Sequence, residues 1–181
     1  LTRSRPLFSV VPSSVVRRPS SRRPSSRRPV VPFPVPAIMP FPDQLRIPTD
    51  VLEIARTLED AGHEAWCVGG AIRDTLLGEP NTDYDIATSA TPDVVQRLFQ
   101  HTVAVGERFG TIAVRTKRRH HEVTTFRRDV DTDGRHAEVV FGVSLEEDLA
   151  RRDFTINAIA YHPLRHEWRD PYQATRDLEA K

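Results

Sequence analysis

The chain has very little cysteine and no long apolar run. Its 181 residues include one cysteine, Cys67, which excludes a disulfide within the chain. Cys67 lies in the apolar run 65–68 (AWCV), so we expect a small buried side chain rather than a nucleophile. No apolar stretch approaches the roughly 20 residues that span a membrane, and the N-terminus lacks the roughly 7–15-residue apolar core of a secretory signal. We therefore expect a cytoplasmic protein with no membrane partner.

Acidic residues are missing from the first 42 positions. This segment carries eight arginines and ten of the 15 prolines, and it repeats the pattern RRPSS over residues 17–28. The other 18 basic residues and all 25 acidic residues lie in 43–181, which gives that part a net charge of −7. A segment of the first kind buries too little apolar surface to offset the entropy of ordering it. We therefore predict a disordered arm over residues 1–42.

Three interpretations of this arm remain open. An acid-free segment rich in arginine and serine resembles an organelle transit peptide, which would change the expected compartment. A basic arm can also bind the RNA backbone without sequence preference. The third interpretation is that residues 1–38 are not native and were translated from a leader. It rests on Met39, the only methionine, which stands directly before the change to globular composition.

The remainder of the chain alternates between helical and strand-like patterns. Thr49 can cap the first helix, and Pro92 suits the first turn of another. The charged stretch 127–137 is expected to be a mobile loop. We predict helices over 50–61, 71–77, 92–99 and 153–160, a further helix from 174, and strands over 64–68, 82–87, 101–105, 111–116 and 121–126. This alternation predicts an α/β (α+β) domain with a sheet of about five strands flanked by helices.

Two aspartates stand one residue apart in a predicted strand. Side chains alternate faces along a strand, so Asp83 and Asp85 are expected to point the same way, with Tyr84 on the other face. Two aligned carboxylates repel each other, and a cation such as Mg²⁺ relieves that repulsion; Mn²⁺ fits the same ligands. The turn at Gly69 and Gly70 comes shortly before, and backbone N–H groups there suit phosphate. Together these features predict a site for a nucleoside triphosphate and a metal.

Long stretches around these residues match a family pattern. Residues 68–78 (VGGAIRDTLLG), 83–88 (DYDIAT) and 147–158 (EDLARRDFTINA) resemble the signature of class II CCA tRNA nucleotidyltransferases and bacterial poly(A) polymerases. Weaker matches are 108–111 (RFGT) and 122–127 (EVTTFR). Both groups belong to the DNA polymerase β-like nucleotidyltransferase superfamily. The resemblance implies its mixed sheet, with a catalytic head domain over 43–172 and the start of a truncated helical neck over 173–181.

The resemblance also assigns the carboxylates. Nucleotidyl transfer requires an attacking 3′-hydroxyl, an α-phosphate and a pyrophosphate leaving group held in line, and two metal ions can neutralise the developing charge. Asp83 and Asp85 would hold these ions. Members of the superfamily often add a third carboxylate from a neighbouring strand, and Glu122 is the candidate. Glu122 can equally be a half-exposed strand residue without a catalytic role.

The nucleotide would be bound by glycines, arginines and their neighbours. Arg73 sits one turn into the predicted helix that follows the glycine turn, where it can reach phosphate. Asp74, its neighbour, is expected to form a structural ion pair. Asn157 lies four residues after Asp153 and is expected on the same helical face, as a sugar or phosphate contact. The expected nucleotide-binding residues are Gly69, Gly70, Arg73, Arg152, Asp153 and Asn157.

The resemblance predicts an enzyme that adds CCA to the 3′ end of tRNA without a template, with CTP and ATP as donors. A poly(A) polymerase or a split CC-adding or A-adding enzyme would share this head domain. In the family, base choice depends on a downstream neck motif that this sequence lacks, so the base remains open. An alternative of another class is a non-catalytic RNA-binding fragment. We also expect the 181 residues alone to bind triphosphate poorly and to transfer nothing.

Overall fold

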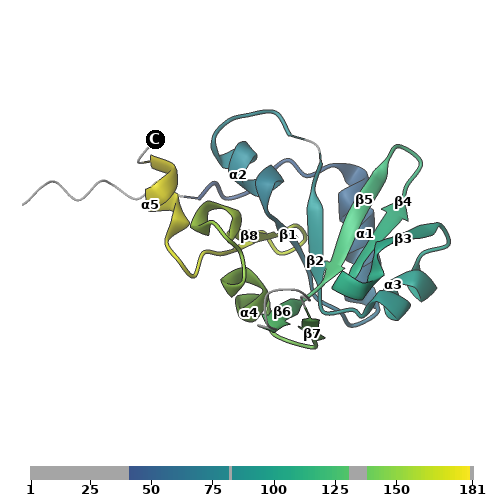
Figure 1. The fold of residues 1–181 in the computed structure, drawn as a ribbon. Coiled ribbons are helices and arrows are strands. Elements are labelled where there is room, and N and C mark those ends of the chain that lie inside the picture. The colour runs from purple at the N-terminus through teal and green to yellow at the C-terminus, as the bar shows by residue number, and fades with distance from the viewer. Residues whose placement is uncertain (1–40, 82, 131–137, 180–181) are drawn as a thin grey trace, which may run out of the picture. The chain divides into compact units, whose positions relative to one another are not determined.

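The structure is a computed structural model that describes residues 41–81, 83–130 and 138–179. All of them belong to one compact unit, Pro36–Lys181, shown as the coloured ribbon in Figure 1. Nearly all of the predicted arm, together with 131–137 of the predicted loop, lies outside the described residues. The predicted disorder of the arm and its three interpretations therefore stay predictions. Within the described part of the chain, no helix combines the length and apolar character needed to cross a membrane.

The described elements alternate between short helices and short strands. The α-helices are α1 (Thr49–Asp60), α2 (Gly70–Leu76), α3 (Pro92–Leu98), α4 (Leu145–Ala150) and α5 (Ala174–Glu179), and single 3₁₀ turns are η1 (Glu107–Phe109) and η2 (Thr155–Asn157). The strands are β1 (Ala65–Val68), β2 (Asp85–Thr88), β3 (Thr102–Gly106), β4 (Thr111–Arg115), β5 (His120–Thr125), β6 (Arg127–Val130), β7 (Glu138–Phe141), β8 (Ala160–His162) and β9 (Glu167–Arg169).

A mixed sheet organises these elements. Among the described residues it has seven strands in the order β3-β4-β5-β2-β1-β8-β9, and β6 pairs with β7 in a separate hairpin. β2 and β5 run parallel, whereas the other paired neighbours in the sheet are antiparallel. The parallel pair brings the beginnings of β2 and β5 to the same end of the sheet. The predicted α+β class, with a mixed sheet flanked by helices, is confirmed.

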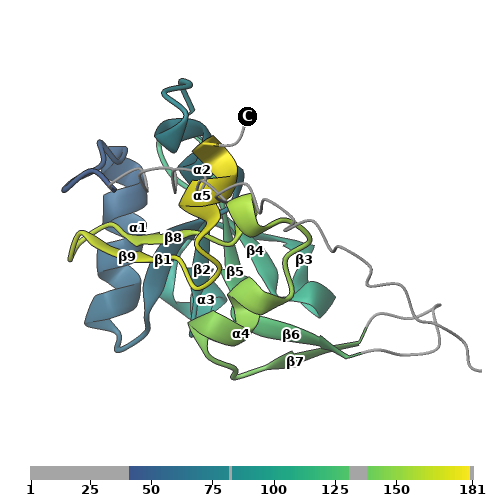
Figure 2. The same ribbon diagram turned by 90° about the vertical axis from the view of Figure 1, so that its left-hand side faces the viewer.

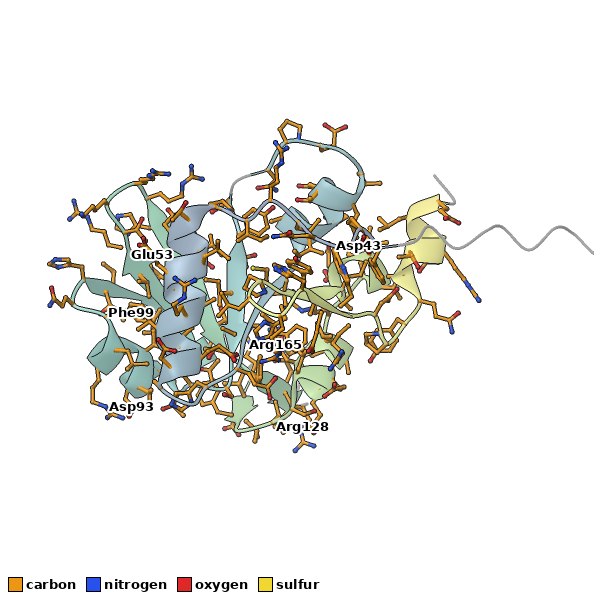
Figure 3. The ribbon with its side chains drawn as sticks, turned by 180° about the vertical axis from the view of Figure 1, so that it is seen from behind. Asp43, Glu53, Asp93, Phe99, Arg128 and Arg165 are labelled. Carbon is orange, nitrogen blue, oxygen red and sulfur yellow. The ribbon has the colours of Figure 1, made fainter. Side chains whose placement is uncertain are left out.

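Helices cover one face of this sheet fully and the other face in part. The apolar stripe of α1, including Ile54 and Leu58, packs with Ile112 and Val123 of the sheet, and Figure 3 shows α1 lying across the back of the sheet. On the other face a second core gathers Leu149 of α4 with apolar side chains of β1, β2 and β8. Figure 2 shows α4 beside the hairpin of β6 and β7. The part of this second face over β3, β4 and β5 includes exposed side chains, among them Val103 and Val105.

The predicted helix over 153–160 is wrong. The helix of this region, α4, starts earlier because Ser144 and Glu147 form a reciprocal capping box, and it ends at Ala150. Only the 3₁₀ turn η2 follows, and β8 begins at Ala160. The chain leaves the helix after Arg151, so spacing by four residues does not place Asp153 and Asn157 on one helical face. The predicted helix was placed too far toward the C-terminus.

The estimate of about five strands was too low. The five predicted strands correspond to β1 through β5, with β2 starting at Asp85 rather than at residue 82. Two further hairpins, β6–β7 and β8–β9, add strands of three or four residues. The strands of β6–β7 were not predicted, because they are too short to show a clear period. The first of them replaces part of the predicted loop over 127–137. The predicted helix from 174 is present as α5, whereas its role as the start of a neck stays a prediction.

Candidate functional site

Three carboxylates lie at the shared starting end of β2 and β5. Asp85 is the first residue of β2, and Glu122 precedes Val123, which pairs with Ile86 of β2. Asp83 stands just before the strand. All three are exposed, whereas Tyr84 and Ile86 between and after the aspartates are buried, so the predicted alternation of faces holds. The carboxylates line a hollow of about 570 Å³ together with Val103, Val105, Ala113 and His120.

Asp85 has negatively charged neighbours and is partly buried. The pKa of this carboxyl is raised to about 6, mainly by partial burial and also by the charges of Glu122 and Asp83, against the opposing effect of Arg152. This balance shows that the protein alone does not compensate the carboxylates, which fits a site for a cation. Among the described residues, no three His, Cys, Asp or Glu side chains form a complete metal site. Asp83 and Asp85 would therefore share a cation with oxygens of substrate and water, as Mg²⁺ commonly requires.

The glycine turn between β1 and α2 leaves space beside the charged groups of Asp85 and Arg152. Gly69 has a φ of +77°, a backbone conformation that residues with a side chain rarely adopt. A side-chain carbon there would lie 3.4 Å from Oδ2 of Asp85 and 3.4 Å from Nη1 of Arg152. The corresponding carbon on Gly70 would lie 3.5 Å from Nη2 of Arg73. The turn thus places Asp85 and two arginines around a stretch of bare backbone.

Arg73 is held from two sides. Its Nη2 lies 2.7 Å from Oδ1 of Asp74. The ion pair predicted for Asp74 is therefore formed, and its partner is the neighbouring Arg73. Asn81 donates to the other oxygen of Asp74 at 2.8 Å. On the opposite side, Nη1 of Arg73 donates to Oδ1 of Asn157 at 2.9 Å. Asn157 therefore joins the site by fixing Arg73, a contact that its spacing from Asp153 did not predict.

Arg152 is held by a buried carboxylate that the sequence reading did not single out. Its Nη2 donates to Oδ2 of Asp148 at 3.3 Å, and the side chain of Asp148 is only 1% exposed. Asp148 also accepts from Nε of Arg151 at 3.0 Å and from the backbone N–H of Arg127 at 3.2 Å. The spacing of four residues between Asp148 and Arg152 on a helix could have indicated this pair.

One donor of Arg152 has no partner of its own. Nε of Arg152 is buried and makes no hydrogen bond within the described residues, whereas Nη1 makes a long contact of 3.4 Å with the backbone oxygen of Asn157. A guanidinium beside bare backbone suits an anion such as phosphate, and the long contact leaves Nη1 able to donate to one. This observation supports a nucleotide phosphate near Gly69.

The predicted site residues do not all come together. Gly69, Gly70, Arg73, Asp85, Arg152 and Asn157 are linked by the contacts above, and Asp83 and Glu122 share the hollow with Asp85. Asp153 instead lies exposed between α4 and η2, and no polar contact links it to these side chains within the described residues. The catalytic and binding roles of all these residues remain predictions.

The chain matches known proteins over most of its described part. A family model described as the poly A polymerase head domain matches residues 65–181. A CCA-adding enzyme of Bacillus pumilus is 46% identical over 135 residues, which cover 74% of this chain and 34% of that protein. One of Geobacillus thermodenitrificans is 56% identical over 111 residues, covering 60% of this chain and 28% of that protein. The chain therefore spans about a third of the length of these relatives.

Solved structures show the same similarity. The Bacillus stearothermophilus CCA-adding enzyme in complex with CTP superposes with a TM-score of 0.65 at 44% identity, over 72% of this chain and 31% of that chain. A tRNA nucleotidyltransferase complexed with a primer tRNA and an incoming ATP analog superposes with a TM-score of 0.56 at 30% identity. That match covers 70% of this chain and 36% of the other. In both cases the shared part is a minority of the longer protein.

Proposed function

Since the chain belongs to the poly A polymerase head-domain family, we propose that it forms the catalytic head of an enzyme that adds CCA to the 3′ end of tRNA. CTP and ATP would be the nucleotide donors. The observation that carries this proposal is the placement of Asp85 and Arg152 next to Gly69, because it sets a cation ligand beside a phosphate-binding donor. The relatives named CCA-adding enzymes support the choice of reaction.

We propose that Asp83 and Asp85 hold Mg²⁺, or Mn²⁺, when the nucleotide is bound. The ions would neutralise charge on the attacking and leaving oxygens of the phosphoryl transfer. Arg152 and Arg73 would bind the triphosphate next to the bare backbone of the glycine turn. Asp148 and Asn157 would keep these two arginines in position, and Glu122 would face the site from the side of β5, away from Arg152.

The division of the chain and its surroundings are part of the same proposal. The arm would cover residues 1–42, the catalytic head 43–172 and the start of a helical neck 173–181. We propose the cytoplasm as its compartment and the tRNA 3′ end as its macromolecular partner. The part of the relatives that this chain does not span would supply the remaining grip on tRNA and the choice of base.

A second candidate is a poly(A) polymerase, which the description of the matching family favours. The described residues contain nothing that separates the two reactions, because both use the same phosphates, sugar and metal. The difference would arise in the choice and number of bases added.

The test uses a fusion of this chain to the part of the Bacillus pumilus relative that it does not span, beside the chain alone. Both are incubated with Mg²⁺, CTP and ATP, singly and together, and with tRNA transcripts ending before CCA, after C and after CC. We expect the fusion to add two C and one A, Asp85→Asn to abolish the addition, and the chain alone to add nothing. A long A tail would establish the poly(A) reaction. A folded fusion that transfers no nucleotide would overturn the proposal.

A further inference from the structure

The turn between β4 and β5 concentrates positive charge. Residues 115–120 (RTKRRH), which we call the basic turn, contain four cationic side chains and one histidine, all of them exposed. The unit around them is acidic, with 25 acidic residues against 18 basic ones over 43–181. Among the ion pairs of the described residues, none involves Arg115, Lys117 or Arg118. These three charges are therefore left for a partner outside the described residues.

Hydrogen bonds that lead to buried side chains hold the basic turn in place. Oγ1 of Thr116 accepts from the backbone N–H groups of Arg118 at 3.3 Å and Arg119 at 3.1 Å. The same oxygen lies 3.2 Å from Oδ2 of Asp50, which in turn lies 2.9 Å from Nε2 of His121. Asp50 and His121 are both buried between α1 and β5. A turn fixed in this way loses little conformational entropy when it binds a ligand.

The basic turn lies at the same end of the sheet as the carboxylates. His120 begins β5, pairs with Arg115 and lines the hollow that contains Asp83, Asp85 and Glu122. Glu122 is two residues further along the strand, a step of roughly 7 Å, and its side chain shares a face with that of His120. Figure 1 shows the turn projecting beyond the beginning of β2. His120 therefore places one end of the basic turn at this hollow, whereas Arg115, Lys117 and Arg118 line a second hollow together with Asp50 and Glu53 of α1.

The two groups of cations flank the carboxylates from opposite sides. In the sheet order, β1 lies on one side of β2, and β5 and β4 lie on the other. Arg73 and Arg152 are gathered at the glycine turn that follows β1. The basic turn belongs to the opposite side. A transfer reaction needs two substrates at one centre, and this arrangement offers a separate basic region to each.

We infer that the basic turn binds the phosphate backbone of the RNA strand whose 3′ end enters the hollow. This inference rests on the proposed function, in which Arg73 and Arg152 bind the triphosphate. Lys117 and Arg118 contact backbone phosphates, which lets the turn hold the strand whatever its base sequence. Val103 and Val105, which are 52% and 55% exposed beside the hollow, provide apolar surface for the bases of the same strand.

The first test measures binding of a fluorescein-labelled tRNA transcript that ends before CCA, by anisotropy over a series of salt concentrations. The variant Lys117→Ala/Arg118→Ala is compared with the unchanged chain. The slope of log K against log salt is negative, and each lost phosphate contact reduces its magnitude by about 1. We therefore expect a slope whose magnitude is smaller by about 2, and an affinity lower by roughly 10-fold or more at 0.1 M salt.

The control removes the same charge elsewhere. Arg46→Ala/Arg56→Ala changes two exposed arginines that line a different hollow beside α1, and it is expected to leave the slope nearly unchanged. The N-terminal arm is present in every variant, so its contribution cancels in the comparison. Equal slopes for the two double variants would overturn the inference. Asp85→Asn, which removes no cation, is expected to abolish transfer by the fusion protein and to retain tRNA binding, so failure of the proposed function shows separately.

The second test locates the RNA directly. The single native cysteine, Cys67, is buried, so a new surface cysteine is the reactive thiol. Lys117→Cys and Arg56→Cys are each labelled with a photo-crosslinker and irradiated with the same transcript. We expect crosslinks from position 117 to nucleotides near the 3′ end, and few from position 56. Crosslinks from 117 to distant parts of the tRNA only, or none, would overturn the inference.

Discussion

Asp85 and Arg152 both approach the place where Gly69 has no side chain. A carbon on Gly69 would be equally distant from both, at 3.4 Å from the carboxylate oxygen and 3.4 Å from the guanidinium nitrogen. The two side chains come from residues 67 positions apart in the chain, on β2 and just after α4. The glycine thus leaves space beside both the proposed metal ligand and the proposed phosphate ligand.

Replacing Gly69 by alanine should therefore remove nucleotide binding. The backbone of Gly69, with φ +77° and ψ −145°, makes any side chain there unfavourable by roughly 1–3 kcal/mol, and the new carbon occupies the space beside Asp85 and Arg152. Gly62→Ala is a matched control, because Gly62 has a φ of +84° and nothing within 4 Å of the added carbon. Urea unfolding should show a loss of stability in both variants. Calorimetric titration of the fusion protein with CTP should show loss of binding in Gly69→Ala only.

Asp148→Asn should weaken nucleotide binding, although Asp148 is not proposed to contact the nucleotide itself. Asp148 is buried and pairs with Arg151 and Arg152, so removal of its charge leaves two arginines partly uncompensated, at a cost of about 3 kcal/mol in unfolding free energy. We expect the fusion protein to show a higher KM for CTP with a smaller change in kcat. Glu146→Gln, an exposed acidic residue of the same helix, is the control. A variant with unchanged KM would show that Arg152 keeps its position unaided.

The stability of the metal-free protein should fall as pH rises through the range set by Asp85. The pKa of this carboxyl is about 6 in the folded protein, against 3.8 for the ordinary group, so the folded state holds the proton more tightly. Stability is then lost between about pH 4 and pH 6, and Asp85→Asn removes that loss. Solvent screening at the exposed carboxylate limits the effect to about 1 kcal/mol.

Thermal unfolding with a chelator at pH 4.5 and 7.5 tests this expectation. Asp85→Asn should stabilise the protein more at pH 7.5 than at pH 4.5. Asp93→Asn is the control of opposite sign, because a hydrogen bond from Thr91 lowers the pKa of Asp93. An Asp85→Asn variant with the same gain at both pH values would show that the pKa of Asp85 is not raised in the folded protein.

Local patterns predicted the part of the site that depends on one strand or one turn. The period of two placed Asp83 and Asp85 on one face, and the buried Tyr84 between them shows why, since the opposite face packs into the core. The glycine turn was equally visible, because it joins two adjacent elements. These features require no knowledge of distant residues.

The contacts of Asn157 and Asp148 were not accessible in the same way. Asn157 binds Arg73 across 84 positions, and only the packed sheet brings η2 to α2. The error at 153–160 has a related cause, because the motif residues Arg152 and Asp153 looked like a helix interior, whereas the capping box at Ser144 sets the helix earlier. The basic turn was present in the sequence as RTKRRH, but its position beside the carboxylates depends on the parallel pairing of β2 and β5.

The central claim is that Asp83 and Asp85 hold a metal together with a nucleotide. The most direct measurement is a titration of the fusion protein with Mn²⁺, followed by electron paramagnetic resonance, with and without CTP. The account predicts bound Mn²⁺ that increases in the presence of CTP, is lost in Asp85→Asn and is retained in Asp93→Asn. Equal Mn²⁺ binding by the unchanged fusion and by its Asp85→Asn variant, at every CTP concentration, would contradict the account.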